Sequence, residues 1–266
     1  MSGYDLTRLM IGSYGTLGII AEVRLRTYPR PAATTSLVAR FASRPKLDAA
    51  LHALNGLVLR PTAADFLDAG TLQTLGLTGD YGLALRFAGN PAACQRQLDA
   101  ARTLCEQQAA QVLPVTTALD EVALWERVVA RTALHADPSR YQLRLAVPPA
   151  AFGAALAALE QQAARHGLAL TVGGRARHGL LIAGFVTDPL TAAAFHQALL
   201  RDWPHSQLVA GNLPETAEPW RWGQPPAPMV AALQRQLKDA FDPHDLLNRG
   251  RYVVRVGQAT PVGWVA

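Results

Sequence analysis

Residues 12–20 read Gly12-Ser13-Tyr14-Gly15-Thr16-Leu17-Gly18-Ile19-Ile20, and this stretch is the most informative part of the chain. Three glycines at a spacing of three residues indicate a backbone that approaches another group closely, because glycine has no Cβ and readily adopts positive φ. Residues 5–10 have the apolar spacing of a short helix, and residues 19–26 alternate between apolar and charged side chains, which predicts a half-buried strand. The spacing fits neither a G-x-G-x-x-G pattern nor a P-loop, so by itself it indicates a tight turn that can face an anion or a cofactor.

Two segments at opposite ends of the chain carry a resemblance to a known family. Residues 5–31, DLTRLMIGSYGTLGIIAEVRLRTYPRP, resemble the end of the FAD-binding domain of the vanillyl-alcohol-oxidase/PCMH superfamily. Residues 241–251, FDPHDLLNRGR, resemble the closing F-D-P-x-x-x-x-N-P-G-R of the same superfamily, with Arg249 where proline is usual. Within the superfamily, the chain is most similar to the FAD-binding E subunit of bacterial glycolate oxidase. Two matches in the right order are more specific than either match alone.

The resemblance implies FAD as the cofactor and a set of residues that contact it. The backbone of the first segment lies along the flavin nucleotide in the family, which points to Gly12, Ser13, Tyr14, Gly15, Thr16, Leu17, Gly18 and Ile19 as cofactor-binding residues. Exposed amides of such a turn suit phosphate or flavin carbonyl oxygens, and Thr16 can add a hydroxyl. By the same resemblance, Asn248 and Arg251 approach the isoalloxazine end. Without the resemblance, Asn248 reads as a turn residue and Arg251 as a surface charge.

The family also predicts how the chain is divided. Residues 1–34 are expected to be the C-terminal tail of a PCMH-type FAD-binding domain, residues 35–225 an α+β cap domain, and residues 226–266 a segment that returns to the flavin domain. Family members have a larger N-terminal part with the glycine-rich loops that cradle the FAD pyrophosphate. The chain is therefore expected to be a C-terminal portion that lacks this half, and the isolated chain is expected to be colourless and inactive.

The composition excludes several classes of protein. Half of the residues are hydrophobic and 17% are charged, which indicates a globular core rather than disorder. No signal peptide is expected, because residues 1–5 lack a basic and an apolar region, and no apolar run approaches the ~20 residues of a membrane span. The net charge of +5 comes from scattered arginines, which favours a solvated surface over a nucleic-acid site. Cys94 and Cys105 are two to three turns apart on an expected helix, too far for a disulfide, and no Cys-x-x-Cys suggests zinc or iron–sulfur.

The hydrophobic pattern predicts alternating strands and helices. Strands are expected at 35–41, 63–68, 82–87, 141–147, 168–172, 180–186 and 207–210, and helices at 45–57, 91–110, 119–132, 149–166, 189–201 and 227–241. The helix at 119–132 is expected to present Val122, Leu124, Val128 and Val129 together. Strand–helix–strand units with short connections predict an α+β fold, an antiparallel-sheet cap domain with helices on one face.

Other polar motifs allow a structural and a functional interpretation. The basic, glycine-rich residues 173–179 can hold a carboxylate through Arg175 or Arg177, although a solvated hairpin loop is the simpler interpretation. His178 has no carboxylate at a revealing spacing in the sequence. The metal motif His-x-Gly-Asp-Gly-Asn-x-His of related D-2-hydroxy-acid dehydrogenases is absent from the sequence, and neither a metal site nor a catalytic residue is predicted. Residues 220–222, Trp-Arg-Trp, can stack on a planar ligand, form an interface or pack on the cap domain.

These observations lead to two hypotheses for the function. The first is a truncated FAD-binding subunit of a multi-subunit glycolate or 2-hydroxy-acid oxidase, in which the chain positions flavin for oxidation of the CH–OH group. The second is a non-catalytic assembly subunit that docks a catalytic flavin subunit and an iron–sulfur subunit. Both predict D-like and iron–sulfur partner subunits, a small 2-hydroxy acid as the substrate of the complex and no nucleic acid. The expected location is the cytoplasm, with the inner face of the cytoplasmic membrane reachable through the complex.

Overall fold

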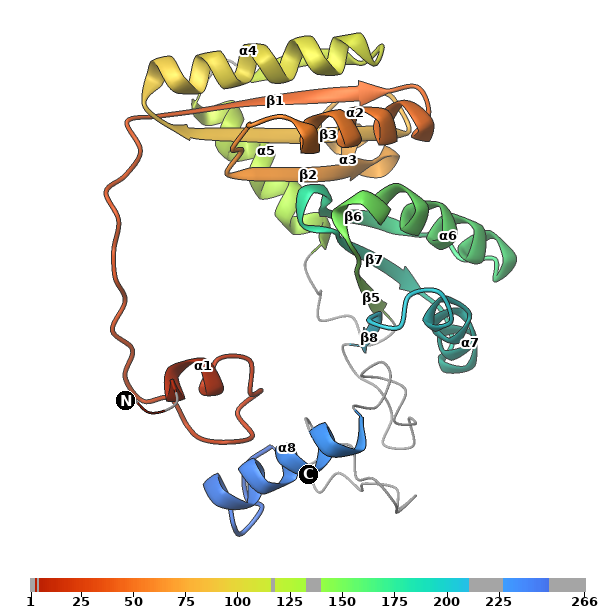
Figure 1. Cartoon of the computed structure of the whole chain (residues 1–266). Helices are drawn as coiled ribbons and strands as arrows, with labels where there is room; N and C mark the ends of the chain where they lie inside the picture. The colour runs from red at the N-terminus through yellow and green to blue at the C-terminus, as the bar shows by residue number, and fades with distance from the viewer. Residues whose placement is uncertain (1–2, 4, 116–117, 133–139, 211–226, 249–266) are drawn as a thin grey trace. The chain divides into compact units, whose positions relative to one another are not determined.

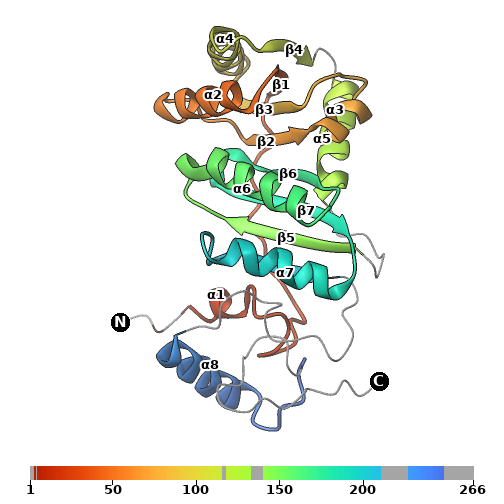
Figure 2. The ribbon, with the colours of Figure 1, turned by 90° about the vertical axis from the view of Figure 1, so that its right-hand side faces the viewer.

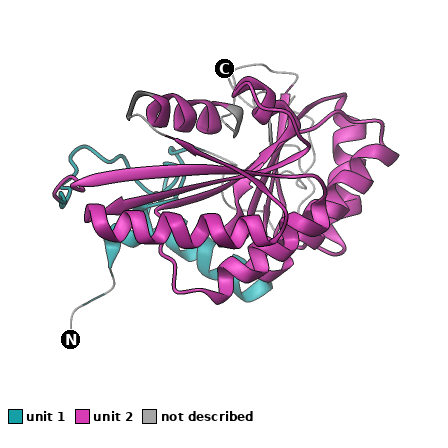
Figure 3. Cartoon of the chain, turned by 90° about the horizontal axis from the view of Figure 1, so that it is seen from above, with its two compact units in different colours: residues 1–28, 214–266 teal, residues 29–213 magenta. Residues whose placement is uncertain are grey.

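The computed structural model describes residues 3, 5–115, 118–132, 140–210 and 227–248 (Figure 1). The chain divides into two compact units, one made of residues 1–28 and 214–266 and the other of residues 29–213 (Figure 3). The smaller unit contains the helices α1 (Leu6–Met10) and α8 (Pro228–Phe241). The three-part domain division expected from the sequence stays a prediction.

The larger unit is built on one eight-stranded antiparallel sheet. Its strands are β1 (Ala33–Phe41), β2 (Ala63–Asp68), β3 (Tyr81–Gly89), β4 (Gln111–Val115), β5 (Arg140–Ala146), β6 (Thr171–Arg175), β7 (Leu180–Val186) and β8 (Gln207–Ala210). They lie in the order β4-β1-β3-β2-β6-β7-β5-β8, and every neighbouring pair is antiparallel (Figures 1 and 2).

The sheet consists of two halves with the same topology. The first half runs β1, α2 (Arg44–Gly56), β2, α3 (Ala69–Thr74), β3, α4 (Pro91–Gln107), β4. The second runs β5, a short 3-10 helix η1 (Pro149–Ala151), α6 (Phe152–Arg165), β6, a second 3-10 helix η2 (Ala176–His178), β7, α7 (Pro189–Leu200), β8. In each half the strands lie in the order fourth, first, third, second, which is the βαββαβ pattern of ferredoxin-like folds. The second strands of the two halves, β2 and β6, pair with each other at the β2–β6 junction.

The helices cover the two faces of the sheet unequally. α2, α4, α6 and α7 pack on the face that carries Leu37, Phe66 and Phe185, where the ring of Phe66 meets that of Phe152 in α6 and the ring of Phe185 meets that of Phe195 in α7. α5 (Ala118–Thr132) packs on the opposite face, where a second core forms from Val38, Leu67, Leu72, Ala84, Leu124 and Val128. The predicted α+β class with an antiparallel sheet is confirmed, and α5 is the helix that departs from the expected single layer.

Most of the expected elements are present, and three of them have the predicted bounds. β2, β7 and β8 occupy the residues expected from the alternating pattern. α3 and β4 were not predicted, because each is a short segment without a clear apolar period. Gly167 follows α6 with a φ of +64°, as expected of a residue that ends a helix.

Residues 19–26 were wrongly predicted to form a half-buried strand. They have no helical or strand assignment, and Ile19, Val23 and Leu25 are 85%, 62% and 81% exposed. A strand needs a partner for its backbone N–H and C=O groups, and no described residue pairs with this segment. Despite its alternating sequence, the segment therefore has no neighbouring strand among the described residues with which it could form a sheet.

Two further expectations need correction in the larger unit. β6 begins at Thr171 and includes Gly173 to Arg175, because these residues pair with both β2 and β7, so the expected loop shrinks to residues 176–179. On α5, Leu124 and Val128 are buried, whereas Val122 and Val129 are 54% and 64% exposed. The buried side of α5 is set by the second core and not by the helix's own apolar content.

Candidate functional site

The glycine turn, residues 12–18, has a backbone conformation that favours glycine at positions 12 and 15. φ is positive at Gly12 (+83°), Tyr14 (+55°) and Gly15 (+68°), a region that residues with a Cβ rarely adopt. The turn follows α1, whose N-cap Asp5 accepts a hydrogen bond from the Arg8 amide at 3.2 Å. The local sequence therefore produces a short capped helix that ends in a left-handed turn.

Hydrogen bonds within the turn hold its centre. The Thr16 amide and hydroxyl both donate to the carbonyl of Ser13, at 3.0 and 2.7 Å. Ser13 and Thr16 are buried, whereas Tyr14 is 51% exposed. The Thr16 hydroxyl proton is thus used to close the turn, and only the oxygen lone pairs of this group are available to a ligand.

Several amides of the turn have no hydrogen-bond partner in the part of the chain that the structure describes. Among the described residues, the N–H groups of Gly15, Leu17 and Gly18 donate no hydrogen bond. Free amides close together in a left-handed turn can donate to phosphate or carbonyl oxygens. The residues present therefore fit an anionic or carbonyl-bearing cofactor group.

Lys238 of α8 attaches the C-terminal segment to the glycine turn. Its Nζ donates to the carbonyls of Thr16 at 2.9 Å and Leu247 at 2.8 Å, and it forms ion pairs with Asp242 and, at 3.4 Å, with Asp245. The Lys238 side chain is only 13% exposed. One ammonium group therefore joins residues that are 222 positions apart in the sequence.

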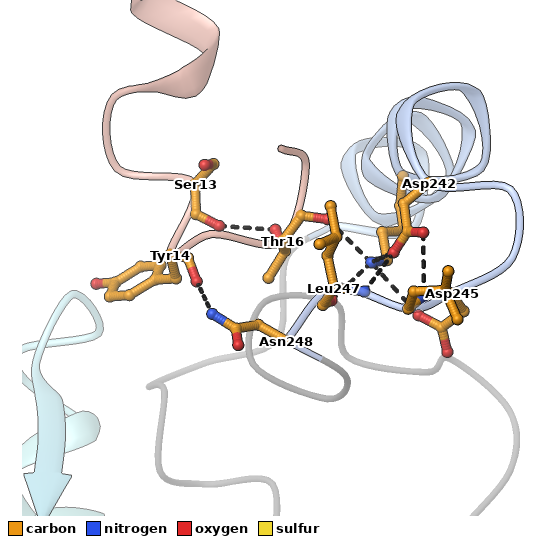
Figure 4. Close-up of polar contacts among 9 residues, drawn as sticks. Ser13, Tyr14, Thr16, Asp242, Asp245, Leu247 and Asn248 are labelled. Carbon is orange, nitrogen blue, oxygen red and sulfur yellow. Dashed lines mark hydrogen bonds and ion pairs between the residues drawn. The ribbon is translucent and has the colours of Figure 1, made fainter. Parts of the chain in front are cut away.

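Asp242 organises the other side of this contact (Figure 4). Its carboxylate accepts hydrogen bonds from the amides of Leu246 at 3.0 Å and Leu247 at 2.8 Å. The hydrogen bond from Lys238, followed by that from the Leu247 amide, lowers the pKa of Asp242 to about 2. This carboxylate is ionised at neutral pH and holds residues 245–248 in a compact turn.

Asn248 lies directly against the glycine turn. Its Nδ2 donates to the Tyr14 carbonyl at 2.6 Å (Figure 4). A Cβ added at Gly15 would lie 2.8 Å from the same Nδ2, so Gly15 is needed both for its φ of +68° and for this close approach. Asn248 itself has a φ of +35°, which asparagine tolerates better than most residues.

The structure thus brings together most of the residues that the sequence selected. Residues 12–18 and Asn248 lie against one another, and Ile19 follows as an exposed residue. Arg251 and the Trp-Arg-Trp motif at 220–222 lie outside the described residues. Lys238 and Asp242 were missed as site residues, although the i, i+4 spacing from Lys238 in α8 to Asp242 in the C-terminal motif was a usable signal.

A second polar cluster, which the sequence did not identify, lies at the β2–β6 junction. Asp65 of β2 is directly opposite Arg175 of β6 in the strand register, and His178 follows in η2. Burial raises the pKa of Asp65 to about 6, although the charges of Arg175 and His178 lower it. The carboxylate that seemed to be missing near His178 therefore comes from a strand more than one hundred residues earlier.

Within the part of the chain that the structure describes, no helix is long and apolar enough to cross a membrane. The same residues contain no group of three or more His, Cys, Asp or Glu side chains that could hold a metal ion. Cys94 and Cys105 are buried free thiols.

The fold and the sequence match known FAD-dependent oxidases. Residues 30–200 and 227–252 match the family of FAD linked oxidases, C-terminal domain. Glycolate oxidase subunit GlcD of Bacillus subtilis (strain 168) is 26% identical over 278 residues, which cover 94% of this chain and 57% of that protein. Glycolate oxidase subunit GlcE of Escherichia coli (strain K12) is 54% identical over 37 residues, or 14% of this chain and 11% of that protein.

Two solved structures have a similar fold at low sequence identity. Alkyldihydroxyacetonephosphate synthase superimposes with a TM-score of 0.62 at 14% identity, over 92% of this chain and 49% of that one. P-cresol methylhydroxylase superimposes with a TM-score of 0.57 at 11% identity, over 81% of this chain and 52% of that one. The chain thus spans about half the length of these proteins. It belongs to the FAD linked oxidases as a C-terminal domain of that family, and FAD is the family's cofactor.

Proposed function

We propose that the chain is the flavin-contacting and cap-bearing part of a subunit of a multi-subunit 2-hydroxy-acid oxidase, similar to the E subunit of bacterial glycolate oxidase. When bound, FAD supplies the hydride-accepting chemistry, and the residues of this chain position it. Glycolate is the first candidate substrate, because glycolate oxidase subunits are among the relatives.

One observation carries the proposal. The amides of Gly15, Leu17 and Gly18, which donate to no described residue, belong to a turn that is held by Lys238 and Asn248. A turn that served only to connect α1 to the next segment would need neither the positive φ values nor these long-range contacts. Preorganised donors of this kind are typical of sites for phosphate or flavin oxygens.

The role of each residue follows from its contacts. The amides of the turn donate to the cofactor, while Thr16 and Ser13 close the turn. Asn248 holds the Tyr14 carbonyl and is close enough to the turn to reach a ligand with its side-chain oxygen. Arg251 is proposed to approach the isoalloxazine end, as expected from the family motif.

The remaining proposals concern the complex. A D-like flavin subunit and an iron–sulfur subunit are the proposed partners, because the relatives GlcD and GlcE are subunits of glycolate oxidase. The alternative is an assembly subunit that docks these partners without carrying flavin.

Photolabelling with 8-azido-FAD distinguishes these functions. The chain would be co-expressed with the D-like and iron–sulfur subunits, purified as a complex, labelled and digested with trypsin. We expect label in the peptide of residues 9–24, which contains the whole glycine turn, and in the peptide of residues 239–249, which contains Asn248. A complex that reduces dye with glycolate but carries no label in either peptide would support the assembly function and refute the flavin site. Absence of glycolate-dependent dye reduction, with lactate and 2-hydroxyglutarate also inactive, would refute the 2-hydroxy-acid oxidase assignment.

A further inference from the structure

The β2–β6 junction places opposite charges at the centre of the sheet. Asp65 and Arg175 are direct partners in an antiparallel register, so their Cβ atoms lie on the same face, about 5 Å apart. This face is the one that carries α5, because Leu67, two residues after Asp65, belongs to the second core with Leu124 and Val128. Charged residues are unusual on the central strands of a sheet, where most positions are buried.

Asp65 differs sharply from Glu121, an acidic residue of the helix α5 that packs on this face. Glu121 of α5 accepts hydrogen bonds from Thr34 at 2.5 Å, Ser36 at 2.8 Å and Arg86 at 3.2 Å. Burial raises the pKa of Glu121, but these hydrogen bonds outweigh the effect and lower it. The half-buried Asp65 carboxylate, in contrast, has no hydrogen bond and no ion pair within 4 Å among the described residues, and burial keeps its pKa near 6.

Of the three basic residues near Asp65, one has a structural hydrogen bond and two have none with a described residue. Arg177 is used structurally, since its guanidinium donates to the Leu59 carbonyl at 2.8 Å. Arg175 and His178 are exposed and make no hydrogen bond or ion pair with a described residue, yet both act electrostatically on Asp65. The junction therefore holds an available guanidinium, an available imidazole and a proton-accepting carboxylate within reach of one another.

We propose that this cluster binds a small 2-hydroxy carboxylate. Arg175 pairs with the ligand carboxylate through two parallel N–H···O bonds, and Asp65 accepts a hydrogen bond from the 2-hydroxyl group. His178 adds a second donor for the carboxylate. The choice of a 2-hydroxy acid rests on the proposed function, whereas the need for a carboxylate beside a hydroxyl donor follows from the cluster itself. A partly buried carboxylate and a guanidinium that do not pair with each other favour a ligand that satisfies both.

Ligand binding to the full chain tests the proposal without flavin. Sodium glycolate, sodium acetate and glycolamide would be titrated at pH 7 and constant ionic strength while the NMR signals of Asp65, Arg175 and His178 are followed. We expect saturable shifts with glycolate, binding of acetate about fivefold weaker because it lacks the hydroxyl, and no saturation with glycolamide, which lacks the charge. Arg175→Gln should weaken glycolate binding at least about tenfold, the effect of one charge-assisted hydrogen bond.

Asp65→Asn separates the two contacts, because it should leave acetate binding in place and remove most of the preference for glycolate. Arg96→Gln is the matched control, since Arg96 is an exposed arginine without a described partner, and it should change nothing. Dispersed NMR spectra of each variant exclude unfolding as the cause.

The proposal fails if glycolate produces no saturable shift at these residues or if Arg175→Gln leaves its affinity unchanged. Equal binding of glycolate and acetate by the wild-type chain would refute the role of Asp65. Saturable glycolate binding together with an unlabelled glycine turn would refute the flavin site and leave this site standing, so the two proposals can fail separately.

Discussion

Replacing Lys238 by methionine tests whether the glycine turn depends on the C-terminal segment. Methionine keeps the length and most of the volume of the side chain but removes the ammonium group. The hydrogen bonds from Nζ to the carbonyls of Thr16 and Leu247 are lost, and Asp242 loses its ion-pair partner. The turn should therefore open locally, whereas α8 keeps its apolar contacts.

The magnitude follows from the two hydrogen bonds to backbone carbonyls. A net hydrogen bond with a charged donor contributes about 1.5–3 kcal/mol, and the lower value applies here because one ammonium group is shared by two carbonyls and two carboxylates. Two such bonds amount to about 3 kcal/mol in the free energy of opening the turn. Because about 1.4 kcal/mol corresponds to a factor of ten, amide protection in the turn should fall by about a hundredfold.

Hydrogen exchange measured by mass spectrometry on peptides covering residues 12–18 reports this opening, since the Thr16 amide is protected by its bond to Ser13. The chain contains one other lysine, Lys46, which is exposed on α2, so Lys46→Met is the matched control. Exchange in residues 12–18 should change with Lys238→Met and not with Lys46→Met. Unchanged exchange in the first variant would refute the idea that Lys238 positions the turn.

Further predictions concern the cluster, the glycines and the thiols. Asp65→Asn should raise the free energy of unfolding by about 3 kcal/mol at pH 7.5. The pKa of Asp65 is about 6 in the folded chain against an ordinary value of 3.8, so the wild-type chain loses stability as the pH rises from about 4 to 6. Urea unfolding at pH 4 and pH 7.5 checks this, and an equal gain at both pH values would contradict it. Gly15→Ala should increase exchange in the glycine turn through strain of about 1–2 kcal/mol. Gly18→Ala should leave the turn intact, because its Cβ would meet only the end of the Met10 side chain, with the sulfur at 3.7 Å and Cε at 3.9 Å. Any loss of azido-FAD labelling in Gly18→Ala would therefore report on the cofactor itself. Cys105, whose pKa burial raises to about 12, should react with a thiol reagent only after denaturant is added, and rapid reaction in the native chain would show that its burial is wrong.

The sequence predicted those features that depend on neighbouring residues. Apolar periodicity located all but two of the sheet strands and helices of the larger unit, and the boundaries of β2 and β7 were correct because turn residues flank both strands. The glycine turn and Asn248 were also selected, through the spacing of their motifs. The prediction of a strand at 19–26 was wrong because a strand depends on a partner that local sequence does not reveal. Alternation describes the two faces of a strand and says nothing about whether a partner strand is present.

The tertiary structure alone decided which distant groups meet. Asp65 and Arg175 face each other because β2 and β6, the equivalent strands of the two halves, pair in one register, and a shift of that register by one residue would put them on opposite faces. Lys238 reaches Thr16 because the two ends of the chain form one compact unit. Local patterns set secondary structure, but the charges that define both candidate sites come from strand register and chain folding, which no local pattern encodes.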